Sequence, residues 1–421
     1  MKLKIAETKS NVYFFLIGIL ILIPFSVEIL NAEFFIFQIT GIFLIFGIVV
    51  LLKKKIRIWN VIDKLILASL FWSFISYVVY FYNLFGNSDL DKEMLRFKSL
   101  IVTLSLYLSY FLGKMIFTGT TNSVKPFYKG IFLCFMLGNL YFFSRFMQMG
   151  FSDLMKTREI MLQRIPMVIA FVSVIALVIG VRDNKKKYLL FFFLPGLILV
   201  FLSMTRAVYL QVGLSILVFL IWYFRKKPKT IILIAVILVA FGGVLNLKNN
   251  YTEQIATRIL SFSSSSGIKK DVSSTYRLKQ WKTLWEKTSE DPLTLVFGHG
   301  QLGATNISTN VDKTEQSSAH NQYLDTWVRE GFIGLFLFLG LLLYIIYFGL
   351  ASGSGIPEQF RSFVFANSIG LIGVFFYGFF HESVRYYQFG YYFMFYAGML
   401  SWMLDEGKNP NKEIQHDEKF S

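Results

Sequence analysis

Residues 166–206 read PMVIAFVSVIALVIGVRDNKKKYLLFFFLPGLILVFLSMTR and contain two apolar runs, one on each side of a basic block. The runs at 166–181 and 188–203 carry no charged residue, whereas the block between them holds one arginine and three lysines. A helix of roughly 20 apolar residues is long enough to cross the hydrocarbon core of a bilayer. The stretch therefore predicts two spanning helices joined by a short basic loop.

The composition of the whole chain agrees with a membrane protein. Of its 421 residues, 55% are hydrophobic and only 16% are charged, against about 25% charged in soluble domains. The apolar residues form continuous blocks and do not alternate with polar ones as the strands of a transmembrane barrel do. The sequence therefore excludes a soluble domain and a barrel, and predicts an all-α polytopic membrane protein.

Twelve apolar runs are separated by charged or turn-rich breaks. They predict spanning helices at residues 12–30, 34–52, 61–83, 99–117, 127–148, 166–181, 188–203, 207–224, 230–246, 331–350, 360–380 and 386–404.

The net charge of +16 is gathered in short blocks between these runs, such as residues 53–57, 182–187 and 225–229. With twelve spans, all three blocks fall on one side, which the positive-inside rule identifies as cytoplasmic. Both termini are then cytoplasmic as well. Topology and anionic membrane lipids account for the blocks, so we expect no nucleic-acid partner.

The expected topology divides the chain into four parts. Residues 1–246 hold helices one to nine, residues 247–330 form one large periplasmic loop, and residues 331–404 hold helices ten to twelve. Residues 405–421 are charged and predict a disordered cytoplasmic tail. Within the loop, residues 275–287 repeat apolar side chains at helical spacing and predict a helix.

Two arginines on the periplasmic side are candidates for binding a phosphorylated lipid, because a guanidinium group offers a fork of donors that matches phosphate oxygens. Arg206 lies in the turn between spans seven and eight, and Arg277 lies near the start of the loop helix. The alternatives are an arginine that extends to the headgroups and an incidental residue at a helix terminus. Weaker candidates on the same side, each also explained as a membrane-border residue, are Arg158, Arg164 and Arg385.

Two histidines lie on the same side. His320 stands where the long loop returns to the membrane, and a lone loop histidine is commonly inert. His381, followed by Glu382, allows either a proton-relay pair or an interfacial polar cluster, and we favour the cluster. No histidine and carboxylate spacing is typical of metal ligands, so neither a metal nor a cofactor is expected.

The residues around His320 resemble a family, the O-antigen ligase and O-antigen polymerase superfamily of bacterial inner-membrane glycosyltransferases. The family pattern is His, then Asn, Ser or Gln, nine residues, Gly, two residues, and Gly, Thr or Tyr. The chain matches it with His320-Asn321, residues 322–330, Gly331 and Gly334. Arg206 after a Ser/Thr-containing turn and Tyr276-Arg277 near the start of the loop match two further family features.

The resemblance implies a GT-C-like bundle of about twelve helices in the inner membrane and a metal-independent reaction at the periplasmic face. A glycan carried on undecaprenyl diphosphate would pass to a hydroxyl of another glycan or of lipid A-core. Arg206 and Arg277 would then stabilise the leaving diphosphate, and His320 would act as the base. Tyr276 and Asn321 are weaker candidates for positioning the substrate.

Two functions within the family remain open, repeat-unit polymerase and ligase, because both share the motif. We slightly favour the polymerase, since each surface-polysaccharide system can need its own. A polytopic transporter or lipid flippase is the alternative from another class. Transporters tend to place ionisable groups near mid-membrane in paired broken helices, whereas here the candidate charges gather at one face.

Overall fold

The computed structural model describes residues 60–83, 90–116, 124–149, 165–203, 205–225, 272–300, 320–351, 356–381 and 387–407, and residues 12, 16–18 and 48. Every regular element in these ranges is helical, which confirms the all-α prediction. The helices are α3 (Val61–Asn83), α4 (Leu90–Ile116), α5 (Val124–Met149), α7 (Ile165–Arg182), α8 (Lys186–Tyr188), the π-helical η3 (Leu189–Phe193), α9 (Leu194–Leu202), α10 (Arg206–Phe224), α14 (Val272–Ser289), α15 (Pro292–Phe297), α17 (Gln322–Ala351), α18 (Glu358–Tyr377) and α19 (Tyr387–Gly407).

Six of the described helices are long and apolar enough to cross a membrane: α3, α5, α7, α10, α17 and α18. Further described helices lie at the predicted spans 99–117, 188–203 and 386–404, in α4, in the α8 to α9 run and in α19. The predicted spans 12–30, 34–52 and 230–246 fall almost entirely outside the described residues. A polytopic helical protein is thus supported, while the count of twelve and the orientation stay predictions.

Two expected boundaries differ from the structure. The helix expected at 331–350 is the second part of α17, which begins at Gln322 and has one non-helical residue, Gly331. Residues 405–407, which were expected to belong to the tail, are the last residues of α19. The charge of Asp405 suggested a tail, but that carboxylate is paired inside the bundle. The helix expected at 275–287 is confirmed as α14.

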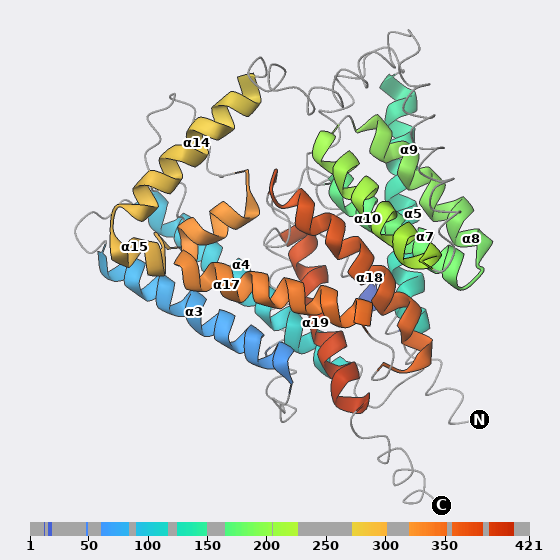
Figure 1. Cartoon of the computed structure of the whole chain (residues 1–421), viewed down its shortest axis with the longest axis horizontal. Helices are drawn as coiled ribbons and strands as arrows, with labels where there is room; N and C mark the ends of the chain where they lie inside the picture. Colours follow the sequence, from blue (N-terminus) through green and yellow to red (C-terminus); the bar gives the residue numbers. More distant parts are fainter. Residues whose placement is uncertain are drawn as a thin grey trace, which may run out of the picture.

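The bundle is organised around α18, which packs against α7, α10 and α17. In Figure 1, α5, α7, α9 and α10 gather on one side of α18, and α3, α14, α15 and α17 gather on the other. The most extensive pairing among the described helices is that of α4 with α19. A Cβ on Gly113 would lie 2.2 Å from the carbonyl oxygen of Phe395, and one on Gly398 would lie 2.0 Å from that of Tyr110. Glycines permit this approach, as small residues do between membrane helices.

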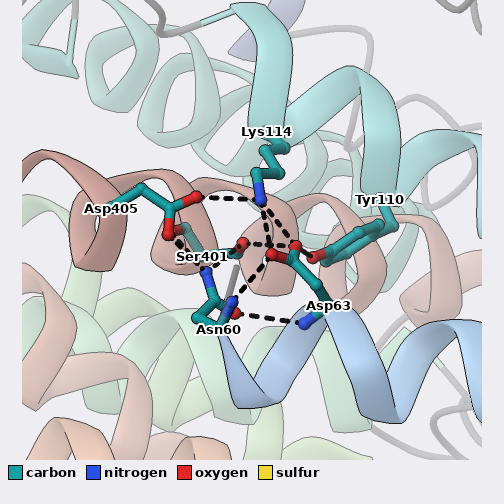
Figure 2. Close-up of polar contacts among 6 residues, drawn as sticks. All are labelled: Asn60, Asp63, Tyr110, Lys114, Ser401 and Asp405. Atoms are coloured by element: carbon teal, nitrogen blue, oxygen red, sulfur yellow. Dashed lines mark hydrogen bonds and ion pairs between the residues drawn. The ribbon is translucent and has the colours of Figure 1, made fainter. Parts of the chain in front are cut away.

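A buried polar network joins α3, α4 and α19 at one end of the bundle, which we call the Lys114 end (Figure 2). The Lys114 ammonium lies 2.6 Å from a carboxylate oxygen of Asp63 and 2.9 Å from one of Asp405. Asn60 and Asp63 cap α3 reciprocally, since each backbone N–H donates to the other's side chain, at 3.2 and 3.1 Å. The hydroxyls of Tyr110 and Ser401 also donate to Asp63.

We expect Lys114→Met to lower the free energy of unfolding by about 3–5 kcal/mol, because it leaves two acidic side chains close together without their cation. Asp63 is only 2% exposed, so water cannot replace the lysine. Unfolding of the purified protein in detergent measures the change. Lys64→Met is the matched control, since Lys64 neighbours Asp63 and its side chain is exposed. Equal stability of the two variants would show that the network contributes little.

Candidate functional site

At the other end of the bundle, which we call the His320 end, the start of α17 is fixed to the end of α18. The backbone N–H of Gln322 donates to the carbonyl of Gly378 at 2.7 Å, and the hydroxyl of Tyr323 donates to the carbonyl of Phe375. Gln322 is 1% exposed. These hydrogen bonds therefore fix the position of the residues just before α17 relative to those just after α18.

Asn321 sets the backbone at the start of α17. Its side-chain oxygen accepts hydrogen bonds from the backbone N–H groups of Tyr323 and Leu324, both at 3.0 Å, which is the geometry of an N-cap. The residue before it, His320, has φ 49°, in the left-handed region that side chains other than glycine rarely adopt. Strained backbone of this kind clusters at functional sites. The structure gives Asn321 a structural task, the capping of α17, beside the substrate role that was expected of it.

The imidazole of His320 faces that of His381, the residue that ends the turn after α18. The ring centroids are 6.1 Å apart and the ring planes are nearly perpendicular, at 84°. His381 is 8% exposed, and its ring stacks on Tyr377 with centroids 5.1 Å apart. Sequence reasoning favoured an inert cluster for His381. Its proximity to His320 is a tertiary contact between residues 61 positions apart, and no local pattern could reveal it.

Arg277 reaches the same turn from α14. One of its terminal nitrogens donates to the carbonyl of Phe380, the residue before His381, at 3.5 Å. The loop helix thus brings a guanidinium to the residue that precedes His381. Tyr276 belongs to the first turns of α14, but its side chain is outside the described part of the structure.

Arg206 is placed by the packing of α10 against α18. The two helices are antiparallel: Trp222 lies against Phe365 with ring centroids 4.1 Å apart, and Ser215 lies beside Gly373. Because the helices are antiparallel, Arg206, the first residue of α10, lies toward the end of α18 that His381 follows. Arg206 is therefore at the His320 end of the bundle. Arg158, Arg164 and Arg385, and Glu382, lie outside the described residues.

The helix that carries His320 is broken at Gly331. This residue has φ 66° and ψ −171°, a conformation open essentially to glycine alone, and a Cβ there would lie 1.9 Å from the carbonyl oxygen of Val296. Gly298 has nearly the same angles, and a Cβ there would lie 2.4 Å from the carbonyl carbon of Arg329. The segment 296–300, at the end of α15, thus meets residues 328–331 of α17 through a pair of glycines.

The break frees two backbone carbonyls of α17, and both find partners in the loop. The N–H of His299 donates to the carbonyl of Val328 at 2.7 Å, and that of Gly300 donates to the carbonyl of Arg329 at 2.9 Å. His299 thus lies in a bend between α15 and the residues that follow it. Burial lowers the pKa of the His299 imidazole, so the ring is neutral at neutral pH.

Side chains of α3 hold the break from the other side. The indole N–H of Trp72 donates to the carbonyl of Glu330 at 2.8 Å, and the Ser73 hydroxyl donates to its carboxylate at 2.9 Å. The Ser76 hydroxyl bonds the carbonyls of Arg329 and Phe297, at 2.9 and 3.1 Å. Sequence reasoning missed these three residues, because they look like ordinary positions of a spanning helix.

The motif now has a physical explanation at each position. Asn321 caps the helix, and Gly331 supplies the only backbone that fits the break. In this chain a Cβ on Gly334 would lie 2.3 Å from the Cβ of Glu330 and 3.3 Å from the indole of Trp72, so glycine lets α17 pack closely on α3 here. The spacing of nine residues is the length of helix between His320 and the break.

No group of three or more His, Cys, Asp or Glu side chains placed to hold a metal ion occurs among the described residues. Metal-independent chemistry remains a prediction from the sequence.

Comparison with known proteins gives one family match. The family model described as O-antigen ligase matches residues 190–339 of the chain. The matched segment contains Arg206, Arg277 and the whole motif from His320 to Gly334. No curated protein matches the chain. Residues 190–339 therefore carry an O-antigen ligase family domain, which confirms the resemblance to the O-antigen ligase and polymerase superfamily.

Proposed function

We propose that the protein transfers a glycan from undecaprenyl diphosphate to a sugar hydroxyl at the periplasmic face of the bacterial inner membrane. The observation that carries the proposal is the contact of Arg277 with the carbonyl of Phe380, the residue before His381, whose imidazole lies beside that of His320 at one end of the bundle. A fixed cation and an imidazole are the two groups that this reaction needs, and they come from elements far apart in the sequence.

The arginines act on the donor. When the acceptor oxygen attacks the anomeric carbon, the bond from that carbon to the diphosphate oxygen breaks and the electron pair stays on the diphosphate. Arg277, with Arg206 at the same end of the bundle, would stabilise this growing negative charge. Guanidinium groups suit the task because they stay charged and bind phosphate oxygens in pairs.

His320 acts on the acceptor. A neutral imidazole takes the proton of the attacking hydroxyl as the new glycosidic bond forms, and later releases it to water. The cap at Asn321 and the break at Gly331 fix the ends of the helical segment behind this imidazole. A base held in a fixed position accelerates the transfer more than a mobile one, because the hydroxyl must contact both the base and the anomeric carbon.

Within this reaction we favour the repeat-unit polymerase, which extends one lipid-linked glycan with another. The ligase, which moves the finished glycan to lipid A-core, uses the same groups. Deletion of the gene and electrophoresis of the surface polysaccharide separate the two: glycans of a single repeat on the core indicate a polymerase, and core without glycan indicates a ligase. An unchanged profile would contradict both.

A transporter or flippase is opposed by the position of the charges. The groups described here lie at one end of the bundle, on a loop helix and at helix ends, whereas transporter sites tend to lie near mid-membrane. A flippase moves the lipid-linked glycan unaltered, so the detection of undecaprenyl diphosphate released by the purified protein distinguishes the two classes.

We expect Arg277→Lys to lower the rate of transfer by roughly 10-fold or more, since lysine keeps the charge but loses the planar fork of donors. Arg206→Lys should have a larger effect. Glycan profiles of cells that carry each variant measure the change, with protein abundance checked by immunoblot. Lys279→Met, an exposed position two residues further along α14, is the control. Wild-type profiles from both lysine variants would show that neither guanidinium makes a specific contact.

A further inference from the structure

His381 is held as a functional side chain would be, although no part of the family motif includes it. Its ring is stacked on Tyr377 and is 8% exposed, and its backbone N–H donates to the carbonyl of Tyr377 at 3.1 Å. The adjacent carbonyl of Phe380 accepts a hydrogen bond from Arg277. One ring contact and two backbone hydrogen bonds thus hold His381 and the residue before it.

The distance between the two imidazoles suits a shared ligand better than a direct bond. With ring centroids 6.1 Å apart, no pair of ring nitrogens approaches the roughly 3 Å of a direct hydrogen bond, since each nitrogen lies only one ring radius from its centre. One oxygen atom placed between the rings can bond both nitrogens at about 2.8 Å each. The perpendicular planes let the two nitrogens approach that oxygen from different directions.

Burial and charge both favour a neutral His381. The ring is almost out of contact with solvent, and a guanidinium lies beside the preceding carbonyl, so a second positive charge there is unfavourable. The rings of His320 and Tyr377 also lie against it. A neutral imidazole carries one N–H donor and one acceptor nitrogen.

We propose that His320 and His381 form a two-imidazole cradle for the attacking hydroxyl of the acceptor glycan. His320 accepts the hydroxyl proton, and His381 donates its ring N–H to the same oxygen. As the O–H bond breaks and the bond to the anomeric carbon forms, the oxygen gains negative charge until that bond is complete, and the hydrogen bond from His381 strengthens. The inference rests on the proposed transfer reaction and assigns His381 to the acceptor side of it.

The test is a two-substrate kinetic measurement on the purified full-length protein. The lipid-linked repeat unit is the donor, and the repeat-unit oligosaccharide freed from its lipid is the acceptor; purified lipid A-core replaces it in a parallel arm. Each substrate is varied at saturating levels of the other. His381→Phe retains a ring to stack on Tyr377 but has no N–H, His381→Gln restores a donor, and His416→Phe in the C-terminal segment is the control.

We expect His381→Phe to lower kcat/KM for the acceptor by roughly 10- to 100-fold, with the donor KM changed less than about twofold. His381→Gln should recover part of the loss. A variant that merely loosens the fold would affect donor and acceptor alike. If the phenylalanine variant does not accumulate in folded form, His381→Leu is measured in its place.

Unchanged acceptor kinetics in His381→Phe, or a donor KM that rises as much as the acceptor KM, would overturn the cradle while leaving the proposed function intact. Absence of transfer by the wild-type protein in both acceptor arms would refute the proposed function itself. The two failures are therefore distinguishable in one experiment.

Discussion

Replacement of His320 by alanine is expected to lower the rate of glycan transfer by roughly 10²- to 10⁴-fold, the usual contribution of a positioned general base. Binding of the lipid-linked donor should persist, because the arginines that we propose to hold the diphosphate remain. The substitution does not relieve the left-handed backbone at φ 49°, since alanine adopts that region less readily than histidine. Turnover and donor binding are measured on the purified variant.

The pH dependence and a second variant separate the two roles that His320 can have. As a base, the wild type should lose activity as the pH falls below about 6.5, where an ordinary imidazole takes up a proton and can no longer accept one. His320→Gln should then be nearly as inactive as His320→Ala. If the ring instead only binds the diphosphate, His320→Gln retains substantial activity and His320→Ala loses donor affinity. Unchanged transfer in His320→Ala would remove this residue from the chemistry.

Gly331→Ala is expected to abolish most of the activity by a structural route. The new Cβ would lie 1.9 Å from one backbone oxygen and 2.2 Å from a backbone carbon, both of Val296, so no side-chain rotation relieves the clash. The backbone conformation alone is unfavourable for alanine by roughly 1–3 kcal/mol. The segments 296–300 and 328–331 must then separate, and the helix that begins after His320 loses its fixed direction.

Transfer activity and the amount of folded protein in the membrane measure this effect. Gly213→Ala is the matched control, because a Cβ there meets nothing within 4 Å and the residue lies in the exposed face of α10. The control should keep wild-type activity. Wild-type activity of Gly331→Ala would mean that the break does not position His320.

The limits of most described helices follow from the sequence, because hydrocarbon thickness and charged breaks determine them. The prediction for residues 61–83 coincides with α3, and the basic block at 182–187 coincides with the turn between α7 and α9. The start of α17 was predicted nine residues late. Polar residues before Gly331 resemble a loop, but Asn321 caps them into a helix that packs on α14 and α15.

The candidate site likewise contains residues that the sequence identifies and residues that only the structure reveals. The motif and the isolated arginines identify His320, Arg206 and Arg277 from local patterns, and the structure places all three at one end of the bundle. His381 and the α3 side chains Trp72, Ser73 and Ser76 act only through tertiary contacts. Asp63 and Lys114 form a buried ion pair that likewise depends on a tertiary contact.

The most direct test of the central claim is transfer by the purified protein in detergent, with the lipid-linked repeat unit as donor, in the presence of EDTA. The account predicts that each glycan transferred to an acceptor hydroxyl releases one undecaprenyl diphosphate, and that His320→Ala prepared in parallel releases almost none. Release of no undecaprenyl diphosphate by the wild type, with either the repeat-unit oligosaccharide or lipid A-core as acceptor, would contradict it.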